Sequence, residues 1–285
     1  MAGLGSQRQP ATWRGLPAWR VASGQVWVVV CPERGGKITS LFDVKARREW
    51  LVPAPVQPLR ALTYGSLWSA YEMCGWDDAF PTLGDCAHPG PGRAADVRLP
   101  DHGEVWALPW ADETDRADAA VMTSVRGAAL RYRLRRKLSV DGPTLRLDYT
   151  LDNEGPDPIP FQWAAHPLIG TRPDSEVVTP VPVARGPGSV PRFAPTDAGL
   201  GWATVVDRGS GHWLRLAWDP VDVPWFALAV DQGALNPQPN VVPIPATGWG
   251  RDVRAACDIG RVRVVAAGAT AAWAVTATVG TGGIP

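Results

Sequence analysis

The sequence predicts an all-β protein, built as a large antiparallel sandwich or barrel, and three observations support this prediction. Many short apolar or β-branched runs are separated by Gly, Pro, Asn or Asp. No segment repeats its apolar residues with a sustained helical period between caps. The glycine patterns of dinucleotide-binding and phosphate-binding loops are also missing. We expect the 285 residues to form one domain, with residues 1–23 as an N-terminal extension.

The first strands are expected at residues 26–30 (VWVVV) and 37–42 (KITSLF), which are joined by a tight turn containing Gly35 and Gly36. A short strand at 47–51 should follow them. The next residues, VPAPVQP, are too rich in proline for a helix interior or a central strand.

Residues 131–151 predict the clearest element, an antiparallel hairpin that turns at Asp141–Gly142. Apolar side chains alternate along both arms, so one face should be buried and the other, which carries Arg131, Arg133, Arg135 and Lys137, should be solvated. Further short strands are expected within 160–170 and at 213–218, 225–230, 261–267 and 271–280.

Composition excludes several classes of partner. The 28 Lys and Arg residues balance the 28 Asp and Glu residues, so neither a nucleic acid nor an anionic membrane is expected as a partner. The four cysteines show no CxxC spacing, which favours a reducing compartment. The N-terminus lacks an apolar signal region, and no run is long enough to span a membrane. We expect a cytoplasmic monomer or homodimer that binds a small neutral molecule.

Residues 75–110 have the composition of a functional site. They combine carboxylates and histidines with tryptophans in a stretch of little regular periodicity, and loops commonly carry such chemistry. A sugar suits this set, because it offers an apolar face for stacking and hydroxyls for carboxylates and imidazoles. The polar residues are Asp77, Asp78, His88, Asp101, His102 and Glu104, and the tryptophans are Trp76, Trp106 and Trp110.

Several segments, taken in order, resemble the aldose 1-epimerase (galactose mutarotase-like) family. They are RGGKITSLFDVKARREWL, GWDDAFPT, LPDHGEVWALPW, LDYTLDNEGPDPIPFQWAAHPL and GATAAWAVTATVG. The resemblance implies a large antiparallel β-sandwich of the galactose mutarotase-like type, which binds a monosaccharide or sugar-like ring. It also implies interconversion of sugar anomers without a cofactor. In that reaction a base takes the C1 hydroxyl proton while an acid protonates the ring oxygen.

By this resemblance His166 corresponds to the family's acid and His102 to a second histidine that binds the sugar. The family's base is a glutamate within a pattern that resembles PIPATGWGRD here, where Ile244 stands in its place. Isoleucine cannot accept a proton, so another carboxylate must act if the reaction is retained. The alternative for each histidine is a purely structural role, as a buried residue that contacts no ligand. The carboxylates that could replace the missing base are, in order of preference, Asp78, Glu104, Asp77 and Asp231.

The expected site therefore has catalytic and binding members. The expected catalytic residues are His166, His102, Asp78 and Glu104, and the expected substrate-binding residues are Trp76, Asp77, Asp101, Trp106, Trp163, Asp231 and Ile244. A metal held by His102, Glu104 and His166 is conceivable but not favoured. The primary hypothesis is an isomerase of the aldose 1-epimerase type. The alternatives are an enzyme with this fold that transfers protons on another ring-bearing metabolite, and a carbohydrate-binding protein without catalysis.

Overall fold

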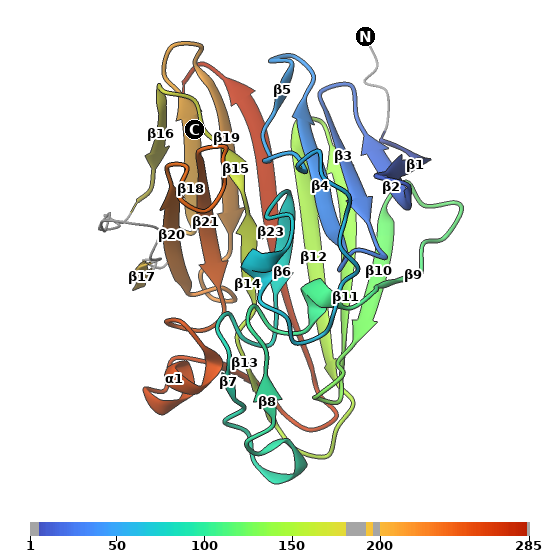
Figure 1. Cartoon of the computed structure of the whole chain (residues 1–285), viewed down its shortest axis with the longest axis vertical. Coiled ribbons are helices and arrows are strands. Elements are labelled where there is room, and N and C mark those ends of the chain that lie inside the picture. Colours follow the sequence, from blue (N-terminus) through green and yellow to red (C-terminus); the bar gives the residue numbers. More distant parts are fainter. Residues whose placement is uncertain (1–5, 181–191, 196–199, 284–285) are drawn as a thin grey trace.

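The computed structural model describes residues 6–180, 192–195 and 200–283, in which two antiparallel sheets face each other (Figure 1). The larger sheet has 11 strands, and along its main path these are hydrogen-bonded in the order β1-β2-β3-β4-β6-β14-β21-β20-β17. Their bounds are β1 Gln7–Trp13, β2 Leu16–Ala22, β3 Val26–Cys31, β4 Lys37–Asp43, β6 Trp76–Ala79, β14 Ala164–Pro167, β21 Asn240–Ala246, β20 Trp225–Asp231 and β17 Arg192–Pro195. Two short strands, β5 (Arg48–Glu49) and β15 (Ile169–Gly170), pair with β4 and β21.

The smaller sheet has eight strands in the order β16-β18-β19-β23-β12-β11-β10-β9. Their bounds are β16 Ser175–Val178, β18 Trp202–Asp207, β19 His212–Trp218, β23 Thr270–Thr281, β12 Thr144–Asn153, β11 Tyr132–Asp141, β10 Val121–Arg126 and β9 Ala111–Asp112. Two small ribbons pair β13 (Ile159–Phe161) with β22 (Arg263–Val265), and β7 (Cys86–Ala87) with β8 (Arg98–Leu99). The helical segments are the 3-10 turns η1 (Trp68–Ala70), η2 (Gly92–Ala94) and η3 (Val105–Ala107), and the helix α1 (Val253–Asp258).

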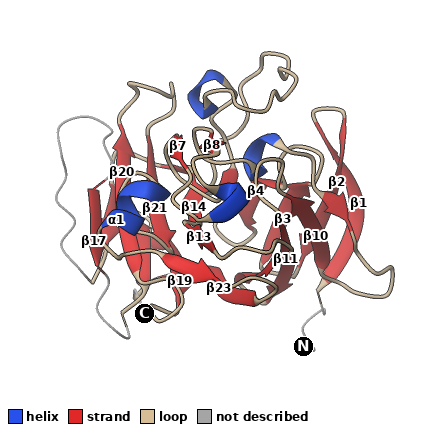
Figure 2. Ribbon diagram, turned by 90° about the horizontal axis from the view of Figure 1, so that it is seen from below, coloured by secondary structure: helices blue, strands red, loops and turns tan. Residues whose placement is uncertain are grey.

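The main hydrophobic core lies between the two sheets. The hairpin β11–β12 contributes alternate residues to it, and Leu145, Leu147, Tyr149 and Leu151 are all buried, as the sequence predicts. A second cluster of buried apolar residues belongs to the opposite face of the larger sheet. The short helices lie on that side, away from β19 and β23 (Figure 2). The predicted antiparallel β-sandwich is therefore confirmed.

Three local features differ from the prediction. The expected extension contains β1 and β2, which form an edge hairpin of the larger sheet. The strand expected at 47–51 is limited to Arg48–Glu49. The six-residue helix α1 was not predicted, and it begins where the Asp252 carboxylate accepts a hydrogen bond from the N–H of Ala255. A helix this short shows too little periodicity to stand out in the sequence.

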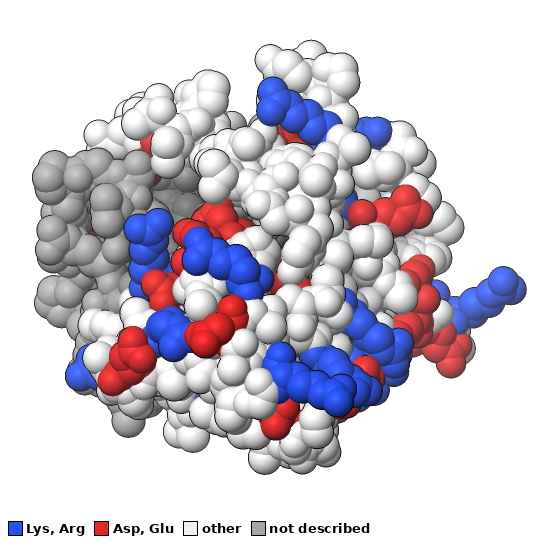
Figure 3. Space-filling model, turned by 60° about the horizontal axis from the view of Figure 1, so that its bottom comes forward, with Lys and Arg blue, Asp and Glu red and all other residues white. Residues whose placement is uncertain are grey.

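The surface agrees with the balanced composition. On the face shown in Figure 3, acidic and basic side chains are interspersed. In the described part of the chain, no helix is both long enough and apolar enough to cross a bilayer.

Candidate active site

A row of side chains crosses five strands of the larger sheet on the face turned away from the smaller sheet. His166 in β14 is paired with Asp77 in β6. Ile38 is paired with Trp76, so the preceding residue, Lys37 in β4, lies next to Asp77. On the other side of His166 the row continues into β21 and β20. Its members, in order across the sheet, are Lys37, Asp77, His166, Ile244 and Ala227.

The strand register places Ile244 beside His166. Ala164 is opposite Ala246, and Ile169 is opposite Val241, so the same antiparallel register on both sides of His166 brings it opposite Ile244. Ile244 is itself paired with Ala227. Ile244, which stands where the resemblance expects the family's base, is thus a direct neighbour of His166. Together with Ala227 it forms the apolar half of the row.

Asp77 belongs to the polar half of the row and is held through one oxygen. Its Oδ2 lies 2.5 Å from Lys37 Nζ and accepts a hydrogen bond from Trp68 Nε1 at 2.9 Å. Lys37 Nζ also donates to the carbonyl oxygen of Cys74. The second oxygen, Oδ1, is buried and has no partner among the described residues. The Lys37 ammonium compensates the charge of this buried carboxylate.

Trp68, from the turn η1, packs against both imidazoles. It stacks on His102 with ring centroids 4.8 Å apart, and it meets His166 edge-on at 4.6 Å. The two imidazole rings are 4.9 Å apart and nearly perpendicular. Asp101 Oδ1 lies 3.1 Å from His102 Nδ1, and its Oδ2 accepts a hydrogen bond from the N–H of Trp68. His102 has a φ of 58°, an uncommon backbone conformation of the kind that is concentrated at functional sites.

The environment favours the neutral form of His166. Burial, together with the nearby His102 and Lys37, lowers the pKa of His166 well below its usual value. Burial alone would raise the pKa of Asp101, but its contacts with His102 and with the Trp68 N–H outweigh burial and lower it. The site thus combines an uncharged imidazole, His166, with a second imidazole that lies against an ionised carboxylate.

The lowered pKa of His166 predicts that stability falls in acid. The unfolded chain binds a proton at His166 near pH 6.5, whereas the folded protein resists that proton. The contribution of His166 to the free energy of unfolding is therefore fully present above about pH 6.5. Below that pH it decreases by up to about 1.4 kcal/mol per pH unit. Urea unfolding between pH 5 and pH 7.5 should show a smaller loss for His166→Gln than for the wild type. Equal losses of stability in the two proteins would contradict a lowered pKa of His166.

Asp78, the first choice for a substitute base, does not reach this site. Adjacent strand residues point to opposite faces, so Asp78 faces the core while Asp77 faces the site. Its carboxylate accepts hydrogen bonds from Arg136 Nη1 and from the hydroxyl of Tyr149, each at 2.9 Å. Burial raises the pKa of Asp78, although Arg136 and Tyr149 oppose the shift. The structure corrects the expectation that Asp78 acts on a ligand.

Glu104 is also turned away from the histidines. Its Oε1 accepts hydrogen bonds from the N–H groups of Ala128 and Ala129 and from the hydroxyl of Tyr64. Glu104 therefore anchors a loop, which corrects its expected catalytic role. Within the described residues, no three His, Cys, Asp or Glu side chains are grouped to hold a metal ion, the set of His102, Glu104 and His166 included.

The predicted tryptophans occupy structural positions. Trp76 and Trp163 are fully buried in the core between the sheets. Trp163 packs there against Tyr149 and Trp273. Trp106 belongs to the second cluster of buried apolar residues. Its Nε1 donates a hydrogen bond to the carbonyl oxygen of Asp101 and so helps to fix the backbone of that residue. The expectation that Trp76 and Trp163 contact a substrate is corrected by their burial.

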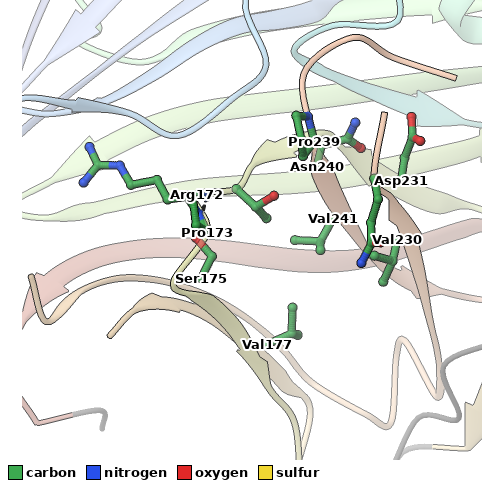
Figure 4. A pocket seen from close by; sticks show the side chains of 11 residues that line it. Arg172, Pro173, Ser175, Val177, Val230, Asp231, Pro239, Asn240 and Val241 are labelled. Carbon is green, nitrogen blue, oxygen red and sulfur yellow. Dashed lines mark hydrogen bonds between the residues drawn. The ribbon is translucent and has the colours of Figure 1, made fainter. Parts of the chain in front are cut away.

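Asp231 lies at the end of β20, outside the row that contains His166. Its carboxylate accepts hydrogen bonds from four successive N–H groups, those of residues 233–236. Asp231 and Asn240 help to line a pocket of about 360 Å³, whose other lining residues include Arg172, Val230 and Val241 (Figure 4). Asn240 is four residues from Ile244 along β21, or about 13 Å. Asp231 is therefore not a neighbour of His166.

The sequence reasoning missed two residues of this site, Lys37 and Trp68, and it also missed Arg136, which holds Asp78 in the core. Lys37 and Trp68 lie outside the stretch 75–110, and only the fold brings them to Asp77. Arg136 could have been detected, because it occupies an inward-facing position of the predicted hairpin. A buried arginine requires a buried carboxylate partner, which would have indicated that one carboxylate of the chain is a structural residue.

The comparisons identify the fold. No family model and no curated protein matches the sequence. Solved structures do match, and the chain has the galactose mutarotase-like fold. A galactose mutarotase related enzyme from Lactobacillus acidophilus superposes with a TM-score of 0.68 at 10% identity, over 93% of this chain and 97% of that one.

Two further solved structures match over nearly their whole length. A galactose mutarotase-like protein from Clostridium acetobutylicum has a TM-score of 0.71 at 10% identity, and the match covers 98% of this chain and 99% of that one. A candidate aldose 1-epimerase from Escherichia coli K12 has a TM-score of 0.68 at 13% identity, with coverage of 97% and 100%. These matches confirm the fold that the family resemblance implied.

Proposed function

We propose that the protein is an isomerase of the aldose 1-epimerase type that opens and recloses the ring of a free sugar or sugar derivative. The observation that carries this proposal is the pairing of His166 and His102, whose rings lie 4.9 Å apart beside Asp77 and Asp101. Anomer exchange requires a donor for the ring oxygen, a base for the C1 hydroxyl and a group that binds the anomeric oxygen. The site offers a residue for each task.

The environments of the two histidines suggest how the tasks are divided. The neutral His166 ring suits donation of a hydrogen bond to the anomeric oxygen as it becomes a carbonyl, since a neutral imidazole can act as an electrophile. His102 Nδ1 lies 3.1 Å from the Asp101 carboxylate, and a carboxylate in this position orients an imidazole for proton transfer. We therefore assign proton donation to the ring oxygen to His102, which revises the acid role expected for His166.

The test is NMR exchange between the α and β anomers of a panel of aldoses. The wild type should accelerate exchange, and His166→Ala should reduce the acceleration by about 10²–10³-fold, as the loss of an oxyanion donor does elsewhere. His212→Ala is the matched control, because His212 lies in β19 of the smaller sheet. A wild type that accelerates no aldose, or a His166→Ala variant as active as His212→Ala, would contradict the proposal.

A second candidate is proton transfer on a less polar ring-bearing metabolite. The specific observation in its favour is the apolar half of the row, where Ile244 and Ala227 follow His166. A hexose carries hydroxyls around its ring and would leave several of them unpaired against such a surface. Binding of such a ring, without exchange of any aldose, would favour this candidate or a binding protein without catalysis.

A further inference from the structure

We infer that Asp77 is the base that takes the anomeric hydroxyl proton, so that the catalytic carboxylate lies on the opposite flank of His166 from position 244. The inference rests on the proposed function and names a catalytic residue for it. Asp77 and Ile244 are the two cross-strand neighbours of His166, one from β6 and one from β21. His166 thus has an apolar neighbour, Ile244, on one flank and a carboxylate, Asp77, on the other.

Two buried atoms without partners mark the binding point. Asp77 Oδ1 and His166 Nδ1 are both buried, and neither has a hydrogen-bond partner among the described residues. Their residues are directly opposite each other on neighbouring strands, where Cβ atoms are about 4.5–5.5 Å apart. Buried polar atoms are nearly always hydrogen-bonded, and these two belong to facing residues, so one ligand group can bind both. One hydroxyl satisfies both, because it donates to the carboxylate and accepts from the imidazole N–H.

The second oxygen of Asp77 fixes the orientation of the base. Oδ2 is held by Lys37 Nζ at 2.5 Å and by Trp68 Nε1 at 2.9 Å, which leaves Oδ1 as the available acceptor. Lys37 and Trp68 are therefore positioning residues. The neighbouring carboxylates are committed elsewhere, since Asp78 is bound to Arg136, and Asp101 contacts His102.

The proposed step balances in atoms and electrons. Asp77 Oδ1 takes the proton of the C1 hydroxyl, and the electron pair of that O–H bond becomes the second bond of the C1 carbonyl. The bond from C1 to the ring oxygen breaks, its electron pair stays on the ring oxygen, and His102 gives that oxygen a proton. His166 donates a hydrogen bond to the carbonyl oxygen throughout. After rotation about the C1–C2 bond, the reverse transfers close the ring on the other face.

The test compares anomer exchange in Asp77→Asn with the wild type. Asparagine keeps the shape and the contact with Trp68 but cannot take the proton, so exchange should slow by about 10²–10⁴-fold while sugar affinity changes only a few-fold. Asp112→Asn is the matched control, because Asp112 is an exposed residue whose carboxylate accepts a hydrogen bond from Trp19. It should retain wild-type exchange.

A second pair of variants guards against misfolding, since Asp77→Asn leaves the buried Lys37 without its carboxylate. The double variant Lys37→Met/Asp77→Asn removes both charges and should be folded and equally slow. Adding formate to Asp77→Ala should restore part of the rate, because a small carboxylate can replace the missing base. Asp77→Asn that exchanges within threefold of the wild type, or Asp77→Ala without formate rescue, would overturn the inference.

The failure of the proposed function is distinguishable from the failure of this inference. A wild type that accelerates aldoses while Asp77→Asn does so equally overturns the role of Asp77 alone. If the wild type accelerates none, the NMR resonances of His166 are followed while D-galactose is added. In that case the proposed function and the role of Asp77 as a base are both overturned. A shift of the His166 resonances that is absent in Asp77→Ala would still support a hydroxyl-binding site shared by the two residues.

Discussion

Replacing Arg136 with methionine should lower the free energy of unfolding by about 3–5 kcal/mol, because it leaves the carboxylate of Asp78 buried without its cation. Arg136 is 1% exposed, and its Nη1 lies 2.9 Å from Asp78 Oδ2. Its guanidinium also donates to the carbonyl oxygen of Gly36 and lies 4.8 Å from the Trp110 ring centroid. This group joins β11 of the smaller sheet to β6 of the larger sheet. Its loss therefore affects the contact between the sheets.

Urea denaturation of Arg136→Met and two comparison variants measures this effect. Arg135→Met is the matched control, since Arg135 is the adjacent, partly exposed residue, and its ion pair with Asp152 should contribute at most about 1 kcal/mol. The double variant Arg136→Met/Asp78→Leu replaces both charges by apolar groups and should recover most of the loss. An Arg136→Met protein within 1 kcal/mol of the wild type would show that the pair does not stabilise the fold.

Replacing Ile244 with glutamate should raise the pKa of His166 by about one to three units, since an opposite charge would stand at the neighbouring cross-strand position. The added carboxylate should also increase the rate of anomer exchange by providing a base where the family resemblance expects one. Ile244 is 1% exposed, so burial of the new charge should reduce stability by several kcal/mol.

NMR titration of the His166 ring protons, together with anomer exchange, measures the effect of Ile244→Glu. Val242→Glu is the matched control. It adds the same charge to the same strand face, but the register places it opposite Leu168 rather than His166, so its shift should be smaller. Equal shifts in the two variants would show that position 244 has no special relation to His166. A folded variant with an unchanged His166 pKa would contradict the strand register itself.

The proposed chemistry depends on how the sheet distributes its two adjacent aspartates. Asp77 and Asp78 differ by one position, and the strand period sends one to the site and the other to the core. Asp78 is matched in the core by Arg136, and Asp77 is matched at the site by Lys37. A one-residue shift of β6 would exchange their roles, so the site depends on this register being held.

Much of the fold could be predicted because it is a local property of the chain. The alternation along residues 131–151 identified both the hairpin and its buried face, and the turn residues located most of the other strands. The family resemblance indicated the sandwich, the two histidines and the isoleucine at position 244. These features depend on residues close together in the sequence or on patterns shared with other chains.

Which carboxylate, lysine and tryptophan lie beside the two histidines was decided by tertiary structure alone. Alternation requires Asp77 and Asp78 to face opposite sides, but only the packing of β6 against its neighbours determines which one meets His166. Lys37 is 40 residues before Asp77 and Trp68 is 9 residues before it, so no local pattern connects them. The pairing of strands distant in sequence brings these groups together. For that reason a carboxylate's position in the sequence could not show whether it binds a ligand or a buried arginine.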